Sequence, residues 1–526
     1  MKQSCVLLCL VAMAVLMMGT RGAAAHDRSA ALDAAAASIT TTDLSEHTGM
    51  LAADTLEGRE AGSRGGRAAA HYIETRLQAA GLQGAGDGGR YVQRFSPNYQ
   101  NLIGVILGAD PALRGEYVLV GAHYDHVGYG NRRNSYGPFG FIHNGADDNA
   151  SGVATLLEVI DALAAAGWQP RRSVLFAFWD GEEKNLLGSR HWVRQPTVPF
   201  ASVRMAINID MVGRMVGDRL EVGGTRTGLG LRRLLSTPRL PEGMKLDFTW
   251  EYKDNSDHWP LFEAGVPSLI LHTGLHGDYH RPSDDVEKLN VPGMQQTAAY
   301  LIDALGQVSD ADELPKFRGQ ARSESPWTQR QRETLLAATP GRLGLSWDWR
   351  TDGDAPEMFV KQVNAKSAAE RAGVRVGDQI IAVDGQEVTN EALLPAAVLR
   401  AESALQLRVV RAGQTAEAAE TFDVTLDGSR VGLGLSWRED AAAPGAVFVT
   451  RVVPYSPAAR AGVAVHDRIY AVDGEPFADA DALLNAVRER TGPEAETVQL
   501  EVETAGRVRN VAVDLKLPIA AEDPSS

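Results

Sequence analysis

The chain has 526 residues, enough for three or four domains of ordinary size. Hydrophobic residues make up 44% of it, which excludes a protein that is disordered throughout. The net charge is −15 and the basic residues are dispersed, so the sequence lacks the basic patch that a nucleic-acid-binding protein needs. We expect no nucleic acid among its partners and take the acidic balance as a sign of a soluble surface.

The first 25 residues have the features of an export signal. Lys2 gives a positive start, residues 6–18 form an apolar run, and residues 23–25 are small enough for cleavage. The run is too short for a dependable membrane span, although an uncleaved anchor is the alternative. Both cysteines lie in this segment, so the mature protein should have neither thiols nor disulfides. We expect export to the periplasm or the medium, with no stable membrane span after cleavage.

Helical and strand patterns alternate through residues 26–312, which we predict to be one catalytic domain. Helical spacing covers about Ala30 to Gly81, and Ser151 is placed to cap a later helix. Such alternation predicts an α/β sandwich with a largely parallel central sheet and helices on both sides. The predicted strands are residues 117–122, 174–179, 205–209 and 267–271, and a final helix covers 291–308.

The C-terminal part of the chain contains an internal repeat. Ser367–Val374 returns as Ser456–Val463, and Ala382–Gly385 returns as Ala471–Gly474. Two copies of this length indicate tandem domains, because solenoids use shorter units in three or more copies. We predict a linker at 313–339, small β-rich domains at 340–427 and 428–518, and a tail at 519–526.

Five segments of the first domain carry acids and histidines at strand ends or in the adjoining loops. In an open α/β sheet the carboxyl ends of the strands form the site, so these side chains should converge. Carboxylates mixed with imidazoles suit zinc, and manganese or cobalt less selectively. Each segment alone could be a solvated turn or a charged helix end. The segments are Gly121–His126, Gly145–Gly152, Trp179–Glu183, Asn208–Met211 and Asp278–Pro282.

With these motifs, residues 45–306 resemble the co-catalytic zinc aminopeptidases, a family that includes secreted bacterial aminopeptidases and glutamate carboxypeptidase II-like enzymes. The resemblance extends to Leu51–Arg59 and Ser256–His258. It implies two Zn²⁺ ions per chain and peptide substrates. Residue by residue, it gives one zinc to His123, Asp147 and Asp210 and the other to Glu183 and His280, with Asp147 bridging both.

The same resemblance implies roles for the remaining site residues. Glu182 would be the general base, Asp125 would support His123, and Tyr279 would help to stabilise the oxyanion. The peptide bond between Asp147 and Asp148 would be cis. The expected activity is removal of N-terminal residues from peptides by a zinc-activated water.

Three alternatives remain open for this domain. A glutaminyl cyclase shares part of the pattern but lacks the paired acids of the bridging loop. A glutamate carboxypeptidase would need a basic pocket, to which Arg214 or Arg281 would have to contribute. A catalytically inactive scaffold would bind no stoichiometric zinc.

The two repeats resemble the PDZ domains of bacterial secreted proteases. The shared signature is Ala-Gly-Val, then Gly-Asp-x-Ile, then Asp-Gly, with His466 in the second copy where the first has Gly377. The resemblance implies that a peptide adds as a strand to a sheet edge, with its C-terminal carboxylate held by the loops around Gly344 and Gly434. Either copy could instead be a packing module, and the whole protein could be an interaction protein in which the peptidase domain is incidental.

Overall fold

The structure is a computed structural model that describes residues 27–96, 98–237, 239–336, 341–353, 355–490 and 496–516. The expected export signal and the tail at 519–526 lie outside these ranges. Among the described residues, no helix has both the length and the apolar character to cross a membrane. The chain divides into two compact units: the first contains the chain up to Gln329 together with Ala505–Arg507, and the second contains the remainder from Arg330 onward.

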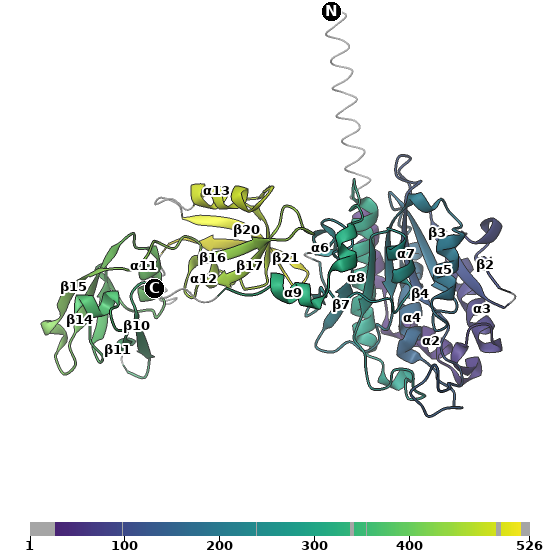
Figure 1. The fold of residues 1–526 in the computed structure, drawn as a ribbon, viewed down its shortest axis with the longest axis horizontal. Helices are drawn as coiled ribbons and strands as arrows, with labels where there is room; N and C mark the ends of the chain where they lie inside the picture. Colours follow the sequence, from purple (N-terminus) through teal and green to yellow (C-terminus); the bar gives the residue numbers. More distant parts are fainter. Residues whose placement is uncertain are drawn as a thin grey trace, which may run out of the picture. The chain divides into compact units, whose positions relative to one another are not determined.

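A nine-stranded sheet forms the centre of the first unit, with the order β1-β3-β5-β4-β6-β9-β7-β8 and β2 paired to β3 (Figure 1). Strands β5, β4, β6 and β9 run parallel, whereas β3 and β7 join them antiparallel. The expected largely parallel sheet is confirmed. The bounds are β1 (Gln83–Gly84), β2 (Val92–Arg94), β3 (Gln100–Ile106), β4 (Tyr117–His123), β5 (Ser173–Trp179), β6 (Val203–Ile209), β7 (Arg219–Gly223), β8 (Lys245–Asp247) and β9 (Ser268–His272).

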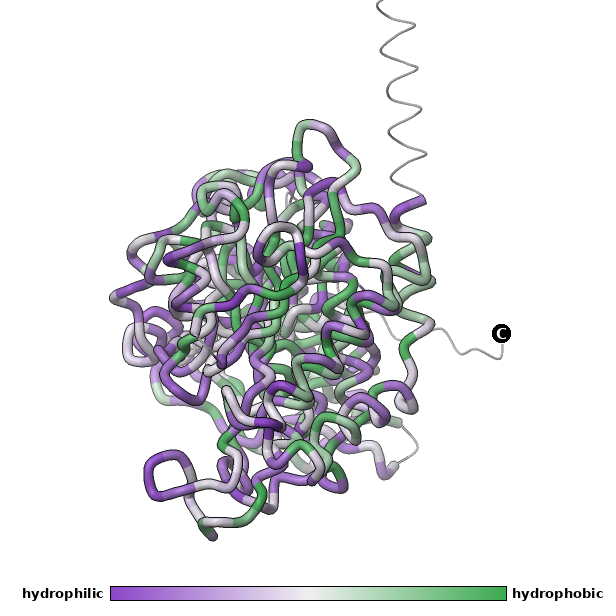
Figure 2. The backbone as a smooth tube through the Cα atoms, turned by 90° about the vertical axis from the view of Figure 1, so that its right-hand side faces the viewer, coloured by the Kyte–Doolittle hydropathy of each residue, from purple (hydrophilic) through white to green (hydrophobic). Residues whose placement is uncertain are grey.

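Both faces of this sheet are buried, as strand β5 shows. Its residues are all buried, and alternate side chains enter different cores: Phe176 packs in one and Leu175 in the other. Hydrophobic segments accordingly lie mainly in the interior (Figure 2). The first core includes residues of the helix at 27–38, α2 (Thr41–Leu51), α3 (Arg64–Ala79), α4 (Gly152–Ala165), α6 (Leu231–Leu235) and α8 (Val291–Asp310), and the second includes residues of α5 (Leu187–Arg194) and α7 (His258–Glu263).

Two local expectations need correction. The helical stretch expected over 30–81 is broken into three α-helices, with non-helical backbone at Glu57 and Gly58. Ser151 directly precedes α4, but its side chain does not cap the helix, because its hydroxyl donates to the carbonyl of Asp147 instead (2.8 Å). The backbone of Ser151 is already helical, whereas that of Asp148 and Asn149 is not.

The first part of the expected linker packs within the first unit. Glu324 accepts hydrogen bonds from Arg226 and Arg318 at 2.6–2.9 Å, and all three side chains are largely buried. The main-chain N–H of Arg318 also donates to Thr227 (2.7 Å). The polar composition that suggested a linker thus reflects a buried ion-pair cluster.

The second unit contains two six-stranded antiparallel sheets of the same order, β10-β11-β12-β14-β15 with β13, and β16-β17-β18-β20-β21 with β19. Each has its own core, so the tandem β-rich domains are confirmed. The first has β10 (Leu345–Arg350), β11 (Glu357–Val363), α10 (Ala368–Ala372), β12 (Gln379–Val383), β13 (Gln386–Glu387), α11 (Leu393–Arg400), β14 (Ala404–Val410) and β15 (Glu420–Thr425). The second has β16 (Leu435–Glu439), β17 (Val447–Val452), α12 (Pro457–Arg460), β18 (Arg468–Val472), β19 (Glu475–Pro476), α13 (Ala480–Arg490), β20 (Thr497–Thr504) and β21 (Arg507–Asp514), while α9 (Pro326–Arg332) spans the boundary between the units.

Candidate metal centre

The parallel strands deliver the candidate ligands to one edge of the sheet. His123 is the last residue of β4, Glu183 follows the end of β5, Asp210 follows β6, and His280 lies beyond β9. Because these four strands point the same way, their carboxyl ends are adjacent. The turn that begins α4 adds Asp148 to the same place.

One group of possible metal ligands gathers around His280. Its Nε2 lies 3.1 Å from Asp148 Oδ2 and 3.1 Å from Glu183 Oε2. His126, which is fully buried, approaches the other oxygen of Glu183 with Nδ1 at 2.8 Å. These four side chains are close enough together to hold one ion.

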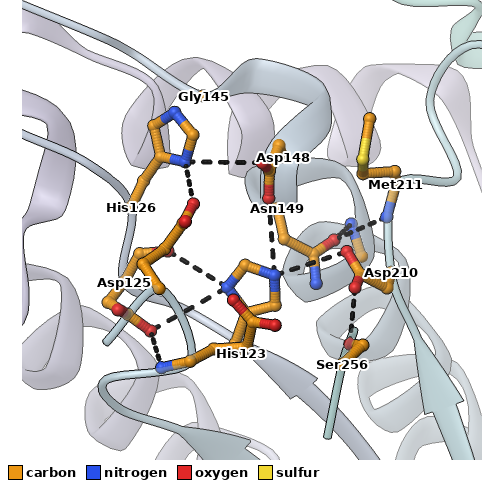
Figure 3. A network of polar contacts seen from close by, with 12 residues as sticks. His123, Asp125, His126, Gly145, Asp148, Asn149, Asp210, Met211 and Ser256 are labelled. Carbon is orange, nitrogen blue, oxygen red and sulfur yellow. Dashed lines mark hydrogen bonds and ion pairs between the residues drawn. The ribbon is translucent and has the colours of Figure 1, made fainter. Parts of the chain in front are cut away.

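A second group shares Asp148 with the first. His123 Nε2 lies 3.4 Å from Asp148 Oδ1 and 3.3 Å from Asp210 Oδ1 (Figure 3). The hydroxyl of Ser256 donates to the other oxygen of Asp210 (2.5 Å). The two oxygens of Asp148 therefore face different groups, as a bridging carboxylate requires.

The donor atoms of both groups suit zinc. Ligands on one tetrahedral zinc, bonded at about 2.0–2.1 Å, lie about 3.3 Å apart. The contacts of His123 and His280 with the carboxylates of Asp148, Glu183 and Asp210 span 3.1–3.4 Å, whereas the contact of His126 with Glu183 is shorter, at 2.8 Å. Imidazole nitrogens with carboxylate oxygens are donors that zinc accepts, and the set leaves room for a water or a substrate atom. The residues present thus fit two zinc ions.

The bridging acid differs from the expectation. Asp147 points away from both groups: its Oδ1 accepts from the N–H of Gly213 (2.6 Å) and the hydroxyl of Ser151 (3.0 Å). Its Oδ2 lies 3.1 Å from His276 Nε2. Asp148 is the acid that both ligand groups share, and the cis peptide bond joins it to Asn149, one residue later than expected. Two adjacent acids in a turn point in different directions, so the motif alone did not identify the one that faces the site.

The three other expected residues all lie at the site. Glu182 belongs to neither ligand group, and its N–H donates to Asp125 Oδ1 (3.0 Å). Asp125 is fully buried, but its main-chain carbonyl, at 3.2 Å, is closer to His123 Nδ1 than its carboxylate, at 3.8 Å. The ring of Tyr279 stacks on His280 with centroids 3.9 Å apart.

Burial and charge set the proton affinities of the neighbouring glutamates in opposite directions. Burial raises the pKa of Glu182 well above its usual range, and repulsion from Glu183 adds to the effect. Burial opposes ionisation of Glu183 as well, but hydrogen bonds with His126 and His280 hold its pKa well below the usual range. For His280, burial lowers the pKa, yet hydrogen bonds with Asp148 and Glu183 raise it to about 11. Glu183 is therefore held in its ionised form, whereas Glu182 readily binds a proton.

Two further buried side chains hold the ligand turn in place. Asp284 Oδ2 accepts the main-chain N–H groups of both Asp147 and Asp148 (3.0 and 3.1 Å). The guanidinium of Arg59 donates to the carbonyls of Tyr124 (3.0 Å) and Gly145 (3.0 Å), which lie beside the two ligand segments. Arg59 lies in the Leu51–Arg59 stretch to which the family resemblance extends. The sequence alone predicted no role for Asp284, His126 or His276.

Each β-rich domain presents an edge strand beside a glycine loop. Strand β10 pairs only with β11, and β16 pairs only with β17, among the described strands. Gly344 (φ 74°) and Gly434 (φ 82°) precede these strands, and a side chain at either would lie within 2.3 Å of Ser367 or Ser456. Glycine is required there because the positive φ and the adjacent serine leave no room for a side chain at the start of the edge strand.

Comparison with protein-family models gives matches over both units. Residues 101–305 match the model described as peptidase family M28, and this range contains all the candidate ligands. Residues 333–410 and 423–503 match the model described as PDZ domain.

Comparison with individual proteins finds relatives with peptidase names. The chain is 28% identical over 322 residues to leupeptin-inactivating enzyme 1 of Streptomyces exfoliatus, covering 60% of this chain and 66% of that protein. It is 30% identical over 210 residues to a probable leucine aminopeptidase of Arthroderma benhamiae, covering 36% and 54%. The chain thus spans less than two thirds of either relative. Among solved structures, the LapA aminopeptidase of Legionella pneumophila is 18% identical with a TM-score of 0.44, covering 54% of this chain and 74% of that one.

Proposed function

We propose that this chain, whose residues 101–305 match peptidase family M28 and whose residues 333–410 and 423–503 match PDZ domains, is a two-zinc exopeptidase that releases residues from the free N-termini of peptides. The observation that carries this proposal is Asp148, whose two oxygens face two separate groups of zinc-type ligands. Relatives named as aminopeptidase and leupeptin-inactivating enzyme support the choice of peptide substrates.

The proposed mechanism assigns separate tasks to the chain's own residues. Bound zinc ions would supply Lewis acidity and a water of lowered pKa. His123, Asp210, Glu183 and His280 would hold the ions, and Asp148 would bridge them. Glu182, whose pKa burial raises, would accept the proton of the attacking water and deliver it to the leaving amine.

The site favours an aminopeptidase over a glutamate carboxypeptidase. A carboxypeptidase needs cationic side chains that are free to bind the terminal carboxylate. Arg214 is already paired with Asp278 (3.0 Å), and Arg281 donates to the carbonyls of Tyr136 (2.9 Å) and Gly137 (3.0 Å). The acidic surroundings of the ligands suit the ammonium group of a free N-terminus better.

Digestion of matched peptides tests this proposal. Full-length protein would be incubated with a peptide bearing a free N-terminus, its N-acetylated twin, and a form amidated at the C-terminus, with products identified by mass spectrometry. We expect successive loss of N-terminal residues from the free and the amidated peptides and none from the acetylated one. Shortening from the C-terminus, or equal cleavage of the acetylated peptide, would overturn the proposal.

The PDZ domains and the N-terminal segment complete the proposed role. Strands β10 and β16 would each accept a peptide strand, with the carboxylate bound at the loops of Gly344 and Gly434. Removal of residues 1–25, export to the periplasm or medium, and PDZ-like domains at 340–427 and 428–518 are part of this proposal. N-terminal sequencing of the secreted protein would test the cleavage site.

A further inference from the structure

A loop at residues 128–142 connects the two ligand segments of β4 and Asp148. Its base is closed by main-chain hydrogen bonds from His143 to Gly128 (2.8 Å) and from Gly140 to Tyr129 (2.8 Å). The hydroxyl of Ser135 in this loop donates to the carbonyl of His280 (3.0 Å). The loop is therefore fixed against the metal centre.

The outer part of this loop exposes an unusual set of aromatic side chains. Tyr136 lies next to the stacked pair of Tyr279 and His280, with its ring centroid 6.1 Å from that of Tyr279 and the two rings tilted by 46°. Soluble surfaces rarely gather large apolar side chains without a binding role. The exposed residues are Tyr129 (47%), Tyr136 (66%), Phe139 (46%) and Phe141 (60%).

A partly open pocket lies near the other ligand group. It has a volume of about 270 Å³, and its lining includes His258, Ile270 and His272. His258 and His272 are near enough to Asp210 to interact electrostatically with its carboxylate. The two ligand groups thus have different surroundings: a partly open pocket near Asp210 and an exposed aromatic loop beside His280.

An exopeptidase that removes one N-terminal residue needs both kinds of surface. The released residue requires a pocket of limited depth, whereas the rest of the peptide must leave along an open face. We propose that the aromatic loop binds substrate residues on the leaving-group side of the scissile bond and selects peptides with apolar side chains at the second and third positions. This inference rests on the proposed aminopeptidase function.

Two tripeptide amides with the same first residue test the proposal, Leu-Phe-Phe and Leu-Ser-Ser. Burying the two phenyl rings against the loop should favour the first in kcat/KM by roughly tenfold. In Phe139→Ser/Phe141→Ser this ratio should fall toward one. Met50→Ser, which removes another exposed apolar side chain, on α2 (41% exposed), should keep the wild-type ratio.

The outcomes separate the loop from the proposed function. If neither peptide loses its first residue, the aminopeptidase function fails and the loop has no substrate to select. If the wild-type protein removes leucine from both peptides equally well, the loop proposal is contradicted while the function stands. If the double variant keeps the wild-type ratio, the aromatic residues serve another partner and the proposal is again wrong.

Discussion

Nδ1 of His126 lies 2.8 Å from Oε1 of Glu183, while the other oxygen of that carboxylate faces His280 at 3.1 Å. An ionised carboxylate only accepts hydrogen bonds, so Nδ1 carries the proton. Nε2 of the same ring has no hydrogen-bond partner among the described residues, consistent with an unprotonated nitrogen. His126 thus fixes the rotation of Glu183 so that Oε2 is presented to the centre.

His126 lies close enough to the His280 group to be a ligand, but its Nδ1 donates to Glu183, so replacing His126 should weaken zinc binding by releasing Glu183. We expect His126→Ala to lower the affinity of the His280 group by about 10- to 100-fold, because Glu183 is no longer held. His126→Asn should retain much of the affinity, since its amide N–H can replace the Nδ1 donor. Competition with a chromophoric chelator measures both. Equal affinity in His126→Ala and the wild-type protein would show that this contact does not matter.

The neighbouring acids of the ligand turn should behave differently. Asp148→Asn removes the bridging carboxylate, so we expect zinc content to fall from two ions toward one and activity to fall with it. Asp147→Asn keeps both ligand groups and changes only the hydrogen bonds to Gly213, Ser151 and His276. Its main effect should be lower stability with two zinc ions retained. Loss of zinc from Asp147→Asn but not from Asp148→Asn would restore the original assignment.

Substitutions of Glu182 and Glu183 should have different effects on zinc binding and turnover. Glu182→Gln touches no ligand, so zinc content should stay at two while turnover falls about 10²–10⁴-fold, as for loss of a general base. Glu183→Gln removes a charged ligand, so metal affinity falls first and excess zinc restores part of the activity. Measuring the zinc content and the steady-state kinetics of both variants distinguishes the two roles. Near-normal turnover in Glu182→Gln would exclude the proposed base.

Stability should depend on pH through Glu158 of α4, which is remote from the ligands. Burial raises its pKa to about 7, and nearby Asp43 and Asp161 contribute. The folded state therefore holds a proton that the unfolded state releases near pH 4.5, so this stabilisation is complete below pH 4.5 and is lost as pH rises through 7. Glu158→Gln stays neutral and can still accept from the N–H of Thr40.

Urea unfolding at pH 5 and pH 8 measures this effect. We expect the free energy of unfolding of Glu158→Gln, relative to the wild-type protein, to be higher at pH 8 than at pH 5. Comparing the two proteins at each pH cancels the titration of all other groups. A difference that is the same at both pH values would show that Glu158 titrates normally.

The sequence predicted the sheet and the location of the site well, because both depend on repeated patterns. The buried strands β4, β5, β6 and β9 are apolar runs, and the acids and histidines that follow them converge once the strands are parallel. The repeat likewise predicted two similar β-rich domains. Periodicity and position at a strand end are properties that a single sequence carries.

Contacts between distant segments could not be predicted in this way. Whether Asp147 or Asp148 faces the centre depends on Gly213 and Asp284, which are far along the chain. The linker expectation failed for its first part for a similar reason, because Glu324 pairs with Arg226, a distant residue of the chain, as well as with Arg318. A sequence does not show whether a polar residue is exposed to water or buried against a partner.

Zinc content of fully active protein tests the central claim most directly. Metal-free full-length protein would be titrated with zinc, and bound metal per chain measured by elemental analysis at each point alongside release of N-terminal leucine from a peptide. We expect activity to reach its maximum only as the second zinc binds, at two ions per chain. Full activity with one zinc per chain, unchanged by further addition, would contradict the shared role of Asp148 between two metal sites.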